Sequence, residues 1–104
     1  MVIAMSVLRL TSENFDEAIS SGKTLVDFWA GWCGPCQILS PVIEALAEDA
    51  EGRATVAKVD IEEESALAAR YRVMSIPTVI LFENGAEAKR FVGVQPKEAY
   101  LAEL

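Results

Sequence analysis

The stretch WAGWCGPCQILSPV, residues 29–42, contains the only two cysteines of this 104-residue chain. Cys33 and Cys36 are three positions apart, with Gly34 and Pro35 between them. The residues before the pair are apolar like those of a buried strand, and the residues after it carry apolar side chains at helical spacing. The cysteine pair is therefore predicted to lie where a strand ends and a helix begins.

The segment that precedes the cysteines, residues 24–30 (TLVDFWA), is apolar on both of its alternating faces apart from Asp27. This pattern is typical of a strand covered on both sides, so it predicts a central strand. After the pair, from about Gly34 to Ala50, apolar residues recur at the spacing of one helix face. They are Ile38, Leu39, Val42, Ile43, Leu46 and Ala47.

The remaining elements alternate between strands and helices. Strands are expected at residues 6–10, 54–61, 77–82 and 86–92, and helices at 12–21, at 63–71 and from Pro96 onward. Thr11 or Ser12 is expected to cap the helix at 12–21. Asn84-Gly85 predicts a tight hairpin, so the last two strands should pair antiparallel. Because helices separate the other strands, we expect parallel crossovers in a three-layer α/β/α sandwich. One domain, residues 1–104, should contain a mixed five-stranded sheet and four helices.

Composition argues against several classes of protein. Nine Lys and Arg residues against 16 Asp and Glu give a net charge of −7, and no basic run could follow a nucleic-acid backbone. The N-terminal MVIAMSVLRL lacks a basic leader and a small-residue cleavage site, so it is interpreted as mature sequence. No apolar run approaches the roughly 18 residues of a membrane span. Two cysteines without a secretory signal favour a reducing, cytoplasmic setting.

Three interpretations of the cysteine pair compete. A purely structural disulfide would close a four-residue loop, which stabilises by only about 2 kcal/mol, against about 4 kcal/mol for a loop of some 60 residues. A zinc site usually needs four ligands, and the chain has no further cysteine and no histidine. The third interpretation, a reversible dithiol, is favoured by position. Cys33 would lie at a helix N-terminus, whose N–H groups and dipole stabilise a thiolate, and Cys36 would lie one turn along.

The segments WAGWCGPC, LSPVIEALAED, VAKVDIEE, SIPTVILFENG and FVG together resemble the thioredoxin family over essentially the whole chain. The resemblance implies the thioredoxin fold and reduction of disulfide-containing proteins, with Cys33 as nucleophile and Cys36 as resolving thiol. It implies no bound cofactor beyond the redox-active disulfide. It also implies that a thioredoxin reductase returns the protein to the dithiol, with electrons from NADPH or ferredoxin. A monomer is the expected state. An oxidase or isomerase on the same fold, or a scaffold subunit with an incidental dithiol, stays open.

Asp27 is the one charged residue of its strand. Burial would raise the pKa of its carboxyl unless Lys58 lies close enough to oppose this, whereas a strand-end position would leave it solvated. The resemblance implies that Asp27 accepts the proton of the Cys36 thiol, directly or through a water, with Lys58 beside it. Trp29 is interpreted as a core residue that also shields the dithiol.

The segments 28–43 and 73–82 contain no charged residue, although 24% of the chain is charged. Their exposed part should form an apolar surface around Cys33 that docks protein substrates by shape. Its expected members are Trp32, Gly34, Pro35, Ile76, Pro77, Val92 and Gly93. The resemblance also implies a cis peptide bond at Ile76-Pro77. Departures from the usual family pattern are Gly31, Gln37 in place of a basic residue, and Met74-Ser75.

Overall fold

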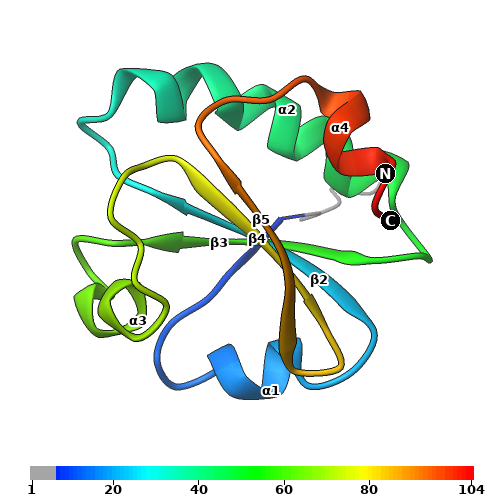
Figure 1. The fold of residues 1–104 in the computed structure, drawn as a ribbon, viewed down its shortest axis with the longest axis horizontal. Helices are drawn as coiled ribbons and strands as arrows, with labels where there is room; N and C mark the ends of the chain where they lie inside the picture. The colour runs from blue at the N-terminus through cyan, green and yellow to red at the C-terminus, as the bar shows by residue number, and fades with distance from the viewer. Residues whose placement is uncertain (1–6) are drawn as a thin grey trace, which may run out of the picture.

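Strand β2 (Lys23–Trp29) lies at the centre of a five-stranded sheet, as its apolar faces predict. A computed structural model describes residues 7–104, and in it the strand order is β1-β3-β2-β4-β5 (Figure 1). The other strands are β1 (Val7–Arg9), β3 (Thr55–Asp60), β4 (Thr78–Glu83) and β5 (Ala86–Val92). The helices are α1 (Phe15–Ile19), α2 (Gly34–Asp49), α3 (Ser65–Arg70) and α4 (Lys97–Leu101). The predicted mixed sheet and four helices are confirmed.

The strands do not all run as the alternating pattern predicts. Strands β1, β3 and β2 are parallel, but β4 runs antiparallel to β2, and β5 antiparallel to β4. The connection through α3 is therefore not a parallel crossover, because β4 starts at the edge of the sheet where β2 and β3 end. Thr78, the first residue of β4, pairs with Phe28 on one side and with Val92 on the other. The segments before β4 and after β5 thus meet the start of α2.

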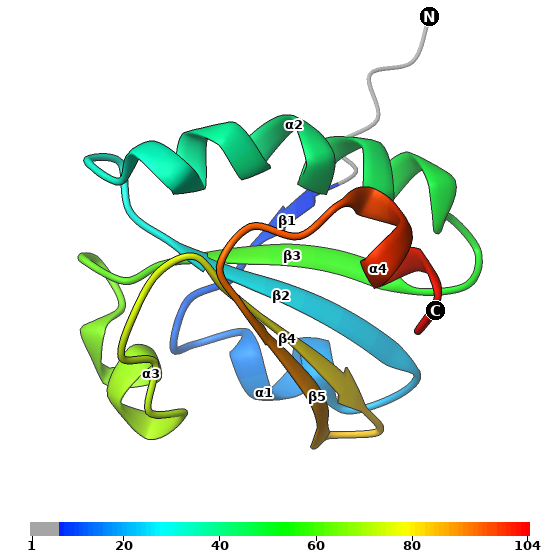
Figure 2. The same ribbon diagram turned by 45° about the horizontal axis from the view of Figure 1, so that its top comes forward.

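The helices cover the two faces of the sheet in pairs. Figure 2 shows α2 and α4 on one side and α1 and α3 on the other. Because side chains alternate along a strand, β2 contributes to both cores: Leu25 packs under α2, whereas Val26 and Phe28 pack against α1 and α3. Asp27 has the same parity as Leu25, so it belongs to the side covered by α2.

Helix α1 is shorter than the predicted 12–21, and neither Thr11 nor Ser12 caps it. The Asn14 side-chain Oδ1 accepts a hydrogen bond from the Thr11 backbone N–H at 2.7 Å, and the Asn14 N–H donates to the Thr11 carbonyl. These bonds hold residues 11–14 in a turn, so the helix begins only at Phe15. For β1, β3, α3, β4 and β5, the observed boundaries lie within two residues of the predicted ones. Ser6, the first residue of the strand predicted at 6–10, lies outside the described residues.

The predicted hairpin between β4 and β5 is confirmed. Asn84 and Gly85 both have positive φ, 51° and 88°, as a two-residue type I′ turn requires. The Asn84 side-chain Oδ1 accepts a bond from the Gly22 N–H at 2.8 Å, and the Asn84 N–H donates to the Gly22 carbonyl at 2.9 Å. The hairpin is thereby fixed to the start of β2.

Candidate active site

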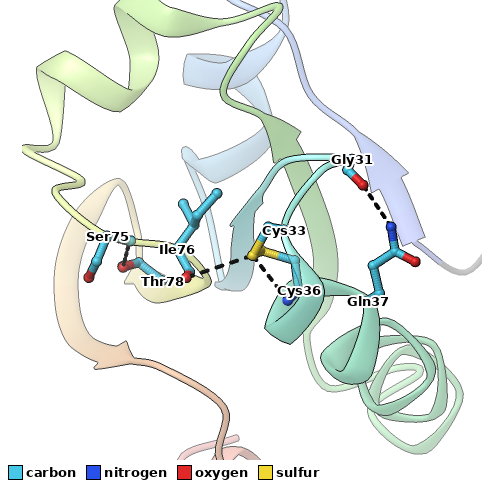
Figure 3. Close-up of a disulfide and its surroundings, with 7 residues drawn as sticks. All are labelled: Gly31, Cys33, Cys36, Gln37, Ser75, Ile76 and Thr78. Carbon is cyan, nitrogen blue, oxygen red and sulfur yellow. Dashed lines mark hydrogen bonds between the residues drawn. A yellow bond between two sulfur atoms is a disulfide. The ribbon is translucent and has the colours of Figure 1, made fainter.

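Cys33 and Cys36 lie at the N-terminus of α2 and form a disulfide (Figure 3). Cys33 is the N-cap residue, with extended backbone, and its Sγ accepts a hydrogen bond from the Cys36 N–H at 3.2 Å. Both side chains are buried. In the reduced protein the same N–H and the dipole of a 16-residue helix would favour the thiolate form of Cys33.

The loop before β4 contacts the disulfide from the other side. The Ile76 carbonyl oxygen lies 3.8 Å from Cys33 Sγ. A disulfide sulfur carries no hydrogen, so in this oxidised state the approach is a contact and not a hydrogen bond. The Ile76-Pro77 bond is cis, which confirms the expectation from the resemblance. The loop is fixed by Thr78, whose hydroxyl donates to the Ser75 carbonyl at 2.7 Å (Figure 3).

The exposed apolar side chains near the disulfide only partly match the predicted docking surface. Trp32, Gly34, Pro35 and Val92 are exposed, Ile76 and Gly93 are half-buried, and Pro77 is buried. Ile38, at 67% of its area, and Met74, at 91%, are also exposed, although they were not among the expected members. The helical pattern had placed Ile38 on the buried face, but the face that packs on the sheet is centred on Leu39 and Ile43. Both residues lie in the uncharged segments 28–43 and 73–82, so the absence of charge was the sequence signal that could have identified them.

Asp27 is 4% exposed, so the expectation of burial is confirmed and the solvated alternative is wrong. It pairs in register with Lys58 on the parallel strand β3, and both side chains belong to the α2 side of the sheet. Among the described residues, none donates a hydrogen bond to Asp27 Oδ1. Burial raises the pKa of Asp27 to about 7, and the positive charge of Lys58 lowers it by a smaller amount.

A cavity of about 350 Å³ joins Asp27 to the dithiol. Its wall includes Asp27, Trp29, Cys36, Ser40 and Lys58. The volume is sufficient for water, and the polar lining would hold it. The Cys36 and Asp27 side chains therefore face one cavity that has room for water.

Trp29 is half-buried and packs against the cluster formed by Ala30 and the two cysteines. The Lys58 Nζ lies 4.9 Å from the centroid of its ring, a cation–π distance. Its indole Nε1 is buried without a partner among residues 7–104. Trp29 therefore packs beside the disulfide and lines the same cavity as Asp27 and Cys36, apart from the two main core clusters.

Two side-chain hydrogen bonds brace the loop that carries the cysteines. The Gln37 amide donates to the Gly31 carbonyl at 2.7 Å (Figure 3), and the Trp32 indole N–H donates to Glu62 at 2.6 Å. A Cβ built on Gly31 would meet no atom within 4 Å. The sequence analysis did not single out Glu62, because the segment DIEEES is typical of a solvated helix start. The available signal was its position just after β3, at the edge of the sheet where the cysteine loop also lies.

Within residues 7–104, no group of three or more His, Cys, Asp or Glu side chains could hold a metal ion. None of the helices of that part of the chain is long and apolar enough to cross a membrane.

Residues 6–104 match the family model described as Thioredoxin. The chain belongs to the thioredoxin family. It is 51% identical to a thioredoxin of Staphylococcus haemolyticus and 50% identical to one of Staphylococcus aureus, in each case over 90% of both chains. Among solved structures, a mutant thioredoxin from Halobacterium salinarum is similar, with a TM-score of 0.87 and 38% identity, covering 99% of this chain and 92% of that one. As a thioredoxin-family member with a Cys33–Cys36 disulfide, the chain is a protein-disulfide oxidoreductase that works by dithiol–disulfide exchange.

Proposed function

We propose that this chain acts as a reductant of protein disulfides, with Cys33 as the nucleophile and Cys36 as the resolving thiol. The observation that supports these roles best is the position of Cys33 as N-cap of α2, where its sulfur accepts the Cys36 N–H. A thiolate is stabilised there more than at Cys36, which lies inside the helix. The chain would act as a single thioredoxin domain.

The reaction takes two steps. The Cys33 thiolate attacks one sulfur of a substrate disulfide, so that a mixed disulfide forms and one substrate thiolate leaves. The Cys36 thiol then loses its proton and attacks Cys33 Sγ, which releases the second substrate thiolate and forms the Cys33–Cys36 disulfide. Two electrons pass to the substrate.

Asp27 is the proposed acceptor of the Cys36 proton, through water in the cavity that both side chains line. A carboxyl with a pKa near 7 is present in both protonation states at neutral pH, which suits a general base. Lys58 tunes it by charge. Trp29 lines the cavity beside Cys36.

The proposed docking surface consists of the exposed residues around Cys33, to which Ile38 and Met74 are added. Trp32, Gly34, Pro35 and Val92 would contact substrate directly, and Ile76 and Gly93 in part. The buried Pro77 would position the Ile76 carbonyl. We further propose a cytoplasmic monomer that is recharged by a thioredoxin reductase.

Two cysteine variants test the assigned roles. Cys36→Ser should accumulate a covalent mixed disulfide with a reporter protein, because resolution is lost, and Cys33→Ser should form none. Mass spectrometry under non-reducing conditions detects the adduct. Adduct formation by Cys33→Ser but not by Cys36→Ser would exchange the two roles, and turnover by either variant at the wild-type rate would reject both.

The direction of electron flow is tested by the reduction potential, measured by equilibration in thiol–disulfide buffers. A value near the −270 mV or so known for thioredoxins supports a reductant, whereas roughly −180 to −120 mV is the range of isomerases and oxidases.

A further inference from the structure

The surface around Cys33 is apolar and uncharged over three separate segments. Residues 28–43, 73–82 and 92–96 contain no Asp, Glu, Lys or Arg. Their exposed side chains include Trp32 and Met74. Apolar contact discriminates poorly between partners, whereas a charge at the rim of an interface adds specificity.

One carboxylate lies at that rim. Among three consecutive glutamates after β3, Glu63 is paired with Arg9, and Glu64 accepts bonds from the backbone and side chain of Ser12. The partners of both glutamates therefore lie in β1 or in the turn that follows it. Glu62 instead binds Trp32, the neighbour of Cys33, with its Oε2 accepting the indole N–H at 2.6 Å.

The Glu62 carboxylate is held in place and keeps capacity for another partner. Its backbone N–H donates to the Asp60 side chain at 2.9 Å, which fixes the turn after β3. Among the described residues, none is bonded to the second carboxylate oxygen, Oε1, and no cation pairs with it. An exposed, oriented and unneutralised carboxylate next to an exposed indole is a site for a cation.

We propose that Glu62 is a specificity-determining residue, which selects protein partners that carry a lysine or arginine beside the disulfide that docks at Cys33. The apolar surface then contacts the backbone and apolar side chains of the partner, and Glu62 pairs with its cation. The proposal rests on the proposed function, since it concerns substrates that dock at that surface.

The test uses two synthetic disulfide peptides that differ only next to the disulfide, one with two lysines and one with two glutamates. Reduction by the dithiol form of the full chain gives kcat/KM for each at low ionic strength. The wild type should prefer the lysine peptide. Glu62→Gln keeps an acceptor for the Trp32 indole but removes the charge, and should lower kcat/KM for the lysine peptide roughly two- to fivefold, the range of an exposed ion pair. Glu62→Lys should reverse the preference.

Glu48→Gln is the matched control. It removes the same charge from the distal end of α2, about 20 Å along the helix from Gly34, where it reports only the effect of the overall net charge. An equal change in both glutamine variants would overturn the proposal, as would a preference that persists in Glu62→Lys. An unchanged reduction potential in Glu62→Gln shows that the dithiol itself is unaffected.

The two levels of the proposal fail differently. If the wild type reduces both peptides equally well and no Glu62 variant changes this, the selectivity is rejected while the reductase function stands. If the wild type reduces neither peptide, nor an unrelated protein disulfide, the proposed function fails and the selectivity with it.

Discussion

The two faces of the sheet differ in what they bury. The face under α1 and α3 is closed by apolar side chains, with Phe15, Tyr71 and Phe82 in mutual ring contact. The face under α2 and α4 has an apolar half as well, but beneath the N-terminal half of α2 it carries Asp27, Lys58 and a cavity. Both faces are built by the same strands, from alternate residues.

The difference separates stability from chemistry. A buried carboxylate with an unsatisfied oxygen is unfavourable for folding, so it persists where it serves a reaction and where another core supplies the stability. Substitutions on the face under α1 and α3 should therefore change the free energy of unfolding. Substitutions in the Asp27 region should change the pH dependence of stability and the rate of dithiol–disulfide exchange.

The largest effect is expected from Phe82→Ala on the face that carries α1 and α3. Phe82 is fully buried and contacts two other rings, so its truncation should lower the free energy of unfolding by about 3–5 kcal/mol. Urea unfolding measures this loss, and Phe82→Leu provides a milder variant. The rate constant of disulfide reduction per folded molecule should not change. A slower reaction at constant reduction potential would contradict the separation of the two faces.

Asp27→Asn should act in the opposite direction on stability. The native pKa of about 7 lies above the unfolded value near 3.8, so the wild type loses stability as pH rises through this window and loses no more above it. The loss amounts to at most about 4 kcal/mol. The variant lacks this dependence, so its stability relative to the wild type should increase from pH 4 to pH 8. Urea unfolding across that pH range measures the difference in stability. In the same variant, resolution of a mixed disulfide by Cys36 should be slower than in the wild type.

Parallel unfolding profiles for the wild type and Asp27→Asn would mean that the carboxyl titrates normally in the folded protein. Glu48→Gln, an exposed substitution on α2, controls for the change in net charge.

Lys58→Met should make the Asp27 region more like an apolar core. Without the positive charge, the pKa of Asp27 should rise further, so the loss of stability should extend to a higher pH than in the wild type. The cation–π contact with Trp29 is also lost, which costs about 0.5–1 kcal/mol. Unfolding profiles against pH measure both effects. The upward shift must vanish when Asp27→Asn is also present, because the carboxyl that titrates is then gone.

The smallest effect is expected at the loop brace. Gln37→Met removes the donor to the Gly31 carbonyl and should cost about 0.5–1 kcal/mol in urea unfolding, the value of one exposed hydrogen bond. Gln37→Lys retains a donor and should stay closer to the wild type. Equal losses in both variants would show that the brace contributes nothing beyond the packing of the glutamine chain.

Strand periodicity was enough to predict the central strand and the burial of Asp27, because a buried strand tolerates few polar residues and each one stands out. The Asn84-Gly85 turn could also be predicted, since the positive φ angles of such a turn restrict which residues can occupy it. These features depend on local chemistry, which the sequence states directly.

The features that were missed depend on contacts between distant segments. The reversal of β4 follows from where the chain returns after α3, and no local pattern reports it. Ile38 belongs to the apolar period of α2, yet it is exposed, because the buried face of the helix is centred on Leu39 and Ile43. Glu62 differs from its neighbours only in the side chain it meets, the Trp32 indole, 30 positions away in the sequence.

The open space at Gly31 bears on how such a protein changes partners during evolution. A Cβ added there would meet no atom within 4 Å, and the bond to Gln37 uses only the carbonyl, which every residue has. A small substitution at this exposed position would therefore change the rim of the proposed docking surface without altering the core. A single codon could therefore change which clients bind, because a small side chain fits there without displacing a neighbour.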